Sequence, residues 1–160
     1  MKKTTLIIIL LLSVTVTKAQ KFDKEKNEIS TVISNFKECI IKKDSAHFIS
    51  FFTPEAFVWV GLLKDHSQSK RLKVNTPPPK NYFLNNYKNF YKFLADKGTQ
   101  EEVFENVQIV NDDVIGSVVF DYRYLSAGEV TNWGKEFWHL VKMNGEWKIV
   151  SVIYSVELTE

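Results

Sequence analysis

The amino-acid sequence predicts an α+β domain in which helices come first and pack on a strongly curved, mostly antiparallel sheet. Apolar residues in the first half of the chain recur at helical spacing, whereas the second half consists of long β-rich segments. Short turn-forming sequences join these segments, and a short connection between neighbouring strands makes them antiparallel. With 160 residues, 44% of them hydrophobic, the chain has the length and composition of one domain with one core.

The first nineteen residues, 1–19, are typical of a cleaved secretory signal peptide. Lys2 and Lys3 precede an unbroken apolar run over residues 6–12, and Ala19 completes a small-residue cleavage site. The apolar run is too short for a membrane-spanning helix, which needs about 20 residues. We therefore expect an exported protein, periplasmic or secreted, that has no contact with a membrane after signal cleavage.

The helical pattern predicts three N-terminal helices. The first, from Glu28 to Lys43, has one apolar stripe. Asp44 is a candidate N-cap for a second, short helix that carries several phenylalanines. A third helix is expected from about Asn81 to Lys97, and the polar, proline-containing segment 64–80 before it is expected to be a loop.

Five strands are predicted from runs of β-branched and aromatic residues. The last four are separated by the turn sequences Asn111-Asp112-Asp113, Ser126-Ala127-Gly128 and Asn144-Gly145. The five strands are expected at residues 56–63, 103–110, 114–125, 130–143 and 146–158.

Composition excludes several classes of protein. Loss of residues 1–19 would leave 18 of the 21 basic residues against 19 acidic ones, so the basic surface of a nucleic-acid-binding protein is not expected. The only cysteine, Cys39, lies far from the cleavage point, so we do not expect a lipoprotein. His47, His66 and His139 are too scattered for metal-ligand spacing. We therefore expect no nucleic-acid partner, no metal and no cofactor.

The final hairpin carries the most specific motif, Asn144-Gly145-Glu146-Trp147-Lys148-Ile149-Val150, followed by Ser155. This motif and the order of the elements, including a short helix that ends in Phe-Thr-Pro-Glu, resemble the nuclear transport factor 2-like superfamily over residues 25–158. The resemblance implies a single cone-shaped, cystatin-like roll with a pocket between sheet and helices, commonly assembled as a dimer through the sheet. The superfamily includes ketosteroid isomerases, dehydratases and polyketide cyclases, so no single activity is implied.

The resemblance also allows the catalytic positions to be compared. Where ketosteroid isomerase has its oxyanion tyrosine and its carboxylate base, this chain has Phe36 and Val60, and neither side chain can transfer a proton. The position of the oxyanion aspartate falls at His139. Isomerase chemistry at these positions is therefore not expected. Dehydration of the scytalone type stays open through His139, Tyr122 and Asp121.

Aromatic residues are the candidate ligand-binding residues. The pocket of the similar association domain of calmodulin-dependent kinase II contains three arginines. The resemblance places Tyr122, Trp138 and Tyr154 at the matching positions of this chain. Trp59 lies where its strand would enter the pocket. Aromatic rings favour flat, apolar or cationic ligands. The predicted ligand-binding set is Trp59, Tyr122, Trp138 and Tyr154.

Glu136 and His139 are the candidate catalytic residues. Because side chains alternate along a strand, only one of them can face the pocket unless a bulge intervenes. A carboxyl buried at Glu136 would have a raised pKa and could act as an acid, a base or a ligand anchor. The alternatives are an exposed ion pair of Glu136 with Arg123 or Lys135, and a half-exposed sheet histidine at His139.

From these observations we expect an exported homodimer that binds a small, partly apolar molecule in an aromatic pocket without catalysis. Two alternatives stay open. One is a lyase or isomerase that acts on a small hydrophobic substrate through Glu136 or His139 with Tyr122. The other is a protein-interaction module.

Overall fold

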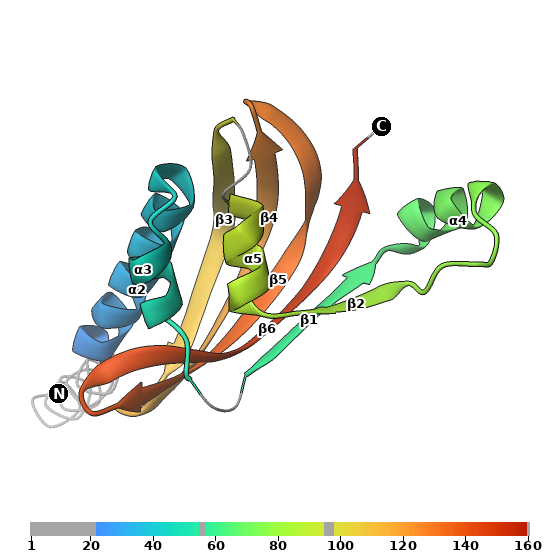
Figure 1. Ribbon diagram of the computed structural model, residues 1–160. Helices are drawn as coiled ribbons and strands as arrows, with labels where there is room; N and C mark the ends of the chain where they lie inside the picture. Colours follow the sequence, from blue (N-terminus) through green and yellow to red (C-terminus); the bar gives the residue numbers. More distant parts are fainter. Residues whose placement is uncertain (1–21, 55–56, 95–97, 160) are drawn as a thin grey trace, which may run out of the picture.

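A six-stranded sheet curls around one side of the helices in the computed structural model (Figure 1). The structure describes residues 22–54, 57–94 and 98–159. The predicted signal segment, residues 1–19, lies outside the described residues. No helix within the described ranges is long and apolar enough to cross a membrane.

The first two helices follow the predicted pattern. Helix α2 (Asp23–Lys42) begins five residues before the predicted start, and its apolar stripe is buried. It ends at Lys43, which has left-handed backbone geometry. The Asp44 carboxylate then accepts a hydrogen bond of 3.1 Å from the backbone N–H of His47, which confirms Asp44 as the N-cap of helix α3 (Ser45–Ser50).

The predicted strands are confirmed, with small changes at their ends. In space the strands follow the order β2-β1-β6-β5-β4-β3; β1 is parallel to β6, and all other neighbours are antiparallel. Asn144 and Gly145 both have positive φ, as a two-residue hairpin turn between β5 and β6 requires. The strands are β1 (Val58–Leu63), β2 (Tyr82–Asn85), β3 (Gln100–Asn111), β4 (Ile115–Ser126), β5 (Glu129–Met143) and β6 (Glu146–Leu158).

Two predictions for the middle of the chain are wrong. The expected loop 64–80 contains helix α4 (Asp65–Val74), so the described residues form four helices rather than three. The expected helix 81–97 starts as strand β2, and helix α5 (Tyr87–Leu94) begins only after it. The Asn86 side chain accepts a hydrogen bond of 2.9 Å from the N–H of Asn89, which fixes the start of α5.

Helix α4 lies apart from the other helices, at the far end of β1 and β2 (Figure 1). It is attached to β6 through Ser67, whose buried hydroxyl donates to Glu157 at 2.6 Å and accepts from the N–H of Leu158 at 2.8 Å. Most of its remaining side chains are polar and exposed, which explains why its sequence lacks the apolar stripe of a helix.

The hydrophobic core lies between α2, α3 and the concave face of the sheet. From Gly134 to Leu140 in β5, buried and exposed residues alternate, so Glu136, Trp138 and Leu140 point inward, whereas Phe137 and His139 are exposed on the convex face. The alternation therefore places Glu136, and not His139, on the face that borders the interior.

Candidate ligand-binding pocket

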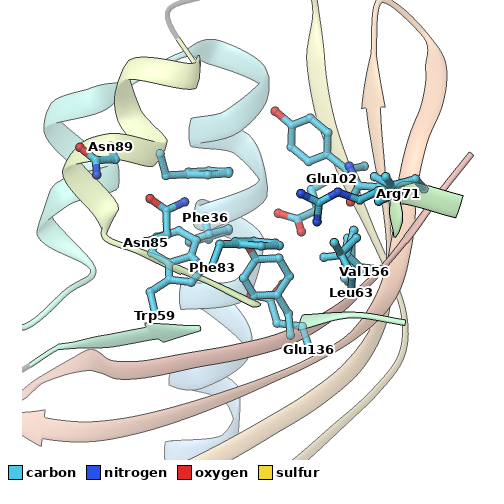
Figure 2. Close-up of a pocket in the computed structure, with 16 residues that line it drawn as sticks. Phe36, Trp59, Leu63, Arg71, Phe83, Asn85, Asn89, Glu102, Glu136 and Val156 are labelled. Carbon is cyan, nitrogen blue, oxygen red and sulfur yellow. The ribbon is translucent and has the colours of Figure 1, made fainter. Parts of the chain in front are cut away.

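A cavity of about 480 Å³ lies between the concave face of the sheet, the strands β1 and β2, and helices α2, α4 and α5 (Figure 2). Of its sixteen described lining residues, seven are aromatic, six others are polar or charged, and three are aliphatic. The lining residues are Phe36, Trp59, Leu63, Arg71, Phe83, Asn85, Asn89, Phe90, Glu102, Tyr122, Tyr124, Asn132, Glu136, Tyr154, Val156 and Leu158.

The aromatic wall is held in place by close packing between rings. The ring centroids of Trp59 and Phe90 lie 5.1 Å apart, and those of Phe83 and Tyr154 lie 5.6 Å apart. Phe83 reaches Tyr154 across Gly61, where an added Cβ would overlap the Phe83 ring and lie 2.7 Å from Cζ of Tyr154. The absence of a side chain at Gly61 therefore lets this part of the wall form.

Two buried carboxyl groups line this cavity. Glu102 comes from β3 and Glu136 from β5, two strands that are separated by β4. The side chains are almost fully buried, with residue exposures of 6% and 5%. Curvature of the sheet brings them close enough for the charge of Glu136 to act on Glu102. Among the described residues, neither carboxyl has an ion-pair partner.

Burial makes both carboxyl groups weaker acids. Burial raises the pKa of Glu136 to about 7, although the indole N–H of Trp138, which donates to Glu136 Oε1 at 2.5 Å, acts in the opposite direction. Burial, and then the charge of Glu136, raises the pKa of Glu102 well above its usual range. Near neutral pH the pair therefore keeps at least one proton, and it can both donate and accept hydrogen bonds.

Two tyrosine hydroxyls and an indole N–H are among the other polar groups of the cavity. The Tyr122 hydroxyl donates to the backbone oxygen of Ser155 at 3.0 Å, and the Tyr154 hydroxyl is hydrogen-bonded to Asn85. Burial, and then the nearby Glu136, raises the pKa of both tyrosines, so the hydroxyls stay protonated. The indole nitrogen of Trp59 is buried and has no hydrogen-bond partner among the described residues. It is therefore a donor that a ligand can satisfy.

Comparison with solved structures identifies the architecture. An NTF2-like protein of unknown function from Shewanella baltica covers 88% of this chain and 99% of its own, with 17% identity and a TM-score of 0.59. A protein from Novosphingobium aromaticivorans, provisionally assigned as a scytalone dehydratase, covers 89% and 90%, with 12% identity and a TM-score of 0.67. The chain has the nuclear transport factor 2-like fold.

A third similar structure, a protein of unknown function with a cystatin-like fold from Nostoc punctiforme, covers 82% of this chain and 90% of its own, with 12% identity and a TM-score of 0.57. No family sequence model and no curated protein sequence matches the chain. The resemblance seen in the sequence is thus confirmed at the level of the nuclear transport factor 2-like fold.

Within this fold, three of the four predicted aromatic residues line the cavity: Trp59, Tyr122 and Tyr154. The fourth, Trp138, is fully buried and is not among the described lining residues. Its ring packs 4.7 Å from that of Phe36, and its N–H donates to Glu136. Trp138 therefore supports a cavity residue instead of forming the wall.

His139 and Asp121 lie on the convex face of the sheet. The Nδ1 atom of His139 is 2.7 Å from the Ser151 hydroxyl, and Asp121 forms a 2.6 Å ion pair with Lys135. Tyr122 points to the opposite face, into the cavity. The structure thus does not bring together the predicted set of His139, Tyr122 and Asp121, and His139 lies outside this cavity.

Glu136 lies in the cavity and not in an exposed ion pair. Lys135 is paired with Asp121, and Arg123 is paired with Glu105. The alternative interpretation of Glu136 as a surface residue paired with one of these cations is therefore wrong. Of the positions compared with ketosteroid isomerase, Phe36 lines the cavity, and Val60 is not among its lining residues.

Sequence reasoning missed Glu102, Arg71 and three asparagines of the cavity, Asn85, Asn89 and Asn132. The predicted strand began at residue 103, one position after Glu102. Alternation along β3 places Glu102 on the same face as Phe104, which packs against the core. This shared face is the signal that could have identified Glu102. Arg71 lies in the segment that was expected to be a loop.

A second group of polar side chains lies at the junction of α2 and α3. Potential ligand atoms of Cys39, Asp44 and His47 lie within 4.8 Å of one another, although the sequence showed no metal-ligand spacing. Asp44 already caps α3. Burial, with the charges of Asp44 and Glu38, raises the pKa of the Cys39 thiol to about 11, so the thiol stays protonated. The cap accounts for this arrangement.

Proposed function

We propose that the protein binds a small, partly apolar ligand in the cavity between the sheet and the helices. The observation that carries this proposal is a cavity of about 480 Å³ that is lined by seven aromatic side chains and two buried carboxyl groups. Its volume lies within the usual range of small-molecule sites, about 300–1,000 Å³. Stacked rings would bind the flat, apolar part of the ligand, and the few polar groups would fix its orientation.

Each polar group has a distinct part in this proposal. The Glu102–Glu136 pair offers acceptor oxygens and at least one retained proton, whereas the Trp59 N–H offers a donor with no other described partner. Figure 2 shows Trp59 and Glu102 on opposite sides of the pocket. A ligand that spans the cavity can therefore contact both ends.

Native mass spectrometry of the mature protein tests the proposal, because it detects a retained small molecule together with the mass of the assembly. We expect a reproducible extra mass that is lost in the Trp59→Ala and Tyr154→Ala variants. Trp133→Ala is the matched control, because Trp133 lies on the same sheet but is 43% exposed and is not among the lining residues. Loss of the extra mass in Trp133→Ala as well, or its retention in both cavity variants, would contradict binding in this cavity.

A second candidate function is acid–base catalysis by the carboxyl pair, as in a lyase or isomerase that acts on a small hydrophobic substrate. The observation that favours it is the pKa of about 7 at Glu136, which suits a group that both takes up and releases a proton near neutral pH. Glu136→Gln would then abolish turnover, and the rate would depend on pH through the carboxyl pair. Turnover that survives Glu136→Gln would exclude this role.

We also propose that the mature protein is exported and assembles as a homodimer through the convex face of the sheet. Residues 1–19 support export. The convex face carries large exposed apolar side chains, including Phe137 and its cross-strand partner Ile153, which are 46% and 40% exposed. We expect the dimer mass in native mass spectrometry and the monomer mass for Phe137→Lys. A wild-type monomer would contradict the dimer and would leave the ligand-binding proposal intact.

A further inference from the structure

A purely apolar ligand leaves the acidic pair of the cavity unexplained. Burial of a carboxyl group is costly unless the group is protonated or paired with a positive charge. Glu102 is only 6% exposed and lines the cavity. Its carboxyl group has no hydrogen bond or ion pair among the described residues. Glu136 receives one hydrogen bond, from Trp138, and likewise has no cationic partner there. The pair thus has an unused capacity to bind a donor.

The aromatic side chains beside the two carboxyl groups can also attract a positively charged ligand group. The face of an aromatic ring carries partial negative charge and attracts a cation that lies within about 6 Å of its centre. Tyr122 and Tyr154, with centroids 6.2 Å apart, lie beside the carboxyl groups, since the charge of Glu136 contributes to the raised pKa of both. Rings and carboxyl groups therefore favour the same kind of ligand group, one with positive charge.

We propose that the ligand is a small amine with an attached flat apolar group, and that its ammonium group binds between Glu102 and Glu136. This inference rests on the proposed ligand-binding function and specifies the chemical class of the ligand. The ammonium group donates to the two carboxylates, and the apolar group lies against the aromatic wall. A hydrogen-bond acceptor at the far end of the ligand would satisfy the Trp59 N–H.

Other charged and titratable groups also face the pair. Tyr122 and Tyr124 come from β4, Tyr154 comes from β6, and Arg71 comes from α4, whereas α2 contributes only Phe36 to the described lining. Arg71 is the one basic residue among the described lining residues. Its guanidinium donates at 3.3 Å to the backbone oxygen of Lys80, in the exposed segment after α4. Figure 2 shows the Arg71 side chain pointing into the pocket toward Glu102, so an anionic ligand is the competing possibility.

Binding of an amine must displace the proton that the free pair retains. The amine itself stays protonated below about pH 9, as other alkylamines do. Raising the pH through about 7 ionises Glu136, so the affinity for the amine should increase over this interval. A neutral ligand of the same shape displaces no proton and should show no such increase.

Three probes of matched size test the inference by calorimetric titration of the mature protein. They are 2-phenylethylamine, the neutral 2-phenylethanol and the anionic 3-phenylpropionate. At about pH 8 we expect the amine to bind at least tenfold more tightly than the alcohol, roughly the difference between a charge-assisted and a neutral hydrogen bond. Its affinity should fall about tenfold or more on lowering the pH to about 5.5. Proton release on binding should accompany the preference.

Variants separate the roles of the two carboxyls. Glu102→Gln and Glu136→Gln keep the size of the side chain and remove its charge, so each should abolish most of the preference for the amine. Glu101→Gln is the matched control, because Glu101 precedes Glu102 on β3 and is exposed. It should leave the preference unchanged. The pH dependence of the unaltered protein tests the inference independently, even where a variant fails to fold.

The outcomes distinguish the inference from the function on which it rests. Equal or tighter binding of the alcohol would overturn the amine and leave the ligand-binding proposal standing. Tighter binding of the carboxylate would overturn the amine and assign the charge recognition to Arg71. Binding of none of the three probes, with no retained molecule in native mass spectrometry, would overturn both proposals.

Discussion

Replacement of Glu136 by glutamine should remove a pH-dependent loss of stability. In the folded protein the pKa of this carboxyl is raised from its ordinary value of 4.5 to about 7, so the folded chain holds more protons than the unfolded chain between these two values. The free energy of unfolding therefore decreases as the pH rises from about 4.5 to about 7, and it levels off above that. At about 1.36 kcal/mol per pH unit, the decrease is about 3 kcal/mol.

Glutamine reproduces the shape of the protonated carboxyl, and its side-chain oxygen can still accept the hydrogen bond from Trp138. Near pH 5 the variant and the parent should therefore have similar free energies of unfolding. Near pH 8 the variant should be the more stable by about 3 kcal/mol. The pKa of Glu102 is also raised, in part by Glu136, so the variant should keep a smaller decrease that the double variant with Glu102→Gln removes.

Urea unfolding followed at several values between about pH 5 and about pH 8 measures these differences, with free energies extrapolated to water. Glu101→Gln, on the exposed side of β3, should follow the parent at every pH. Asp112 and Asp121 are half-buried, and hydrogen bonds lower the pKa of each, so both are ionised throughout this window and add no slope. A parent protein whose stability is flat across the window, or a Glu136→Gln variant with the parent's slope, would refute the reasoning.

Two further substitutions test the support of the cavity. Trp138→Phe removes the donor to Glu136 and should raise the pKa of that carboxyl further, so the stability loss should move to higher pH in the same urea experiments; an unchanged midpoint would contradict the role of the indole N–H. Gly61→Ala places a Cβ against Phe83 and Tyr154 and should force these rings toward the cavity. It should lower the affinity for 2-phenylethylamine, measured by calorimetry, and cost about 1–3 kcal/mol of stability; unaltered affinity would show that these rings do not border the ligand.

The sheet could be predicted from the sequence because its signals are local. Strands β4, β5 and β6 alternate over long stretches and are joined by turn sequences such as Asn144-Gly145, so each strand can be recognised alone. Helix α4 and strand β2, which follow β1, could not be predicted in this way. Helix α4 has few buried residues and no apolar stripe, and the aromatic residues around Tyr82–Asn85 fit a helical spacing as well as a strand. Strand β2 is defined by its pairing with β1, and helix α4 is held by its hydrogen bonds to β6.

The candidate site could be predicted only in part, for a related reason. Glu136 was identifiable because it stands alone between aromatic residues in the middle of a strand. Glu102 resembles any charged residue near a strand end, and its significance depends on a partner two strands away. Trp138 lies on the same face of β5 as Glu136, but that face borders the cavity at one end and the filled core at the other. The alternation of side chains along a strand therefore does not distinguish a residue of the cavity wall from a core residue.

The position of Glu102 and Glu136 shows that the polar groups of this pocket depend on this chain's own residues, although the shape of the pocket comes from the fold. A flat sheet would keep side chains of β3 and β5 apart, because β4 runs between them and neighbouring strands are about 4.8 Å apart. Strong curvature turns both strands toward a common interior, so a fold of this kind can place polar groups from several different strands in one cavity. Here Phe36 occupies the position compared with a catalytic tyrosine, and carboxyl groups enter from Glu102 and Glu136 instead. Recognition of a ligand by this protein should therefore follow from that pair and its aromatic surroundings, and not from the activities of proteins that share the fold.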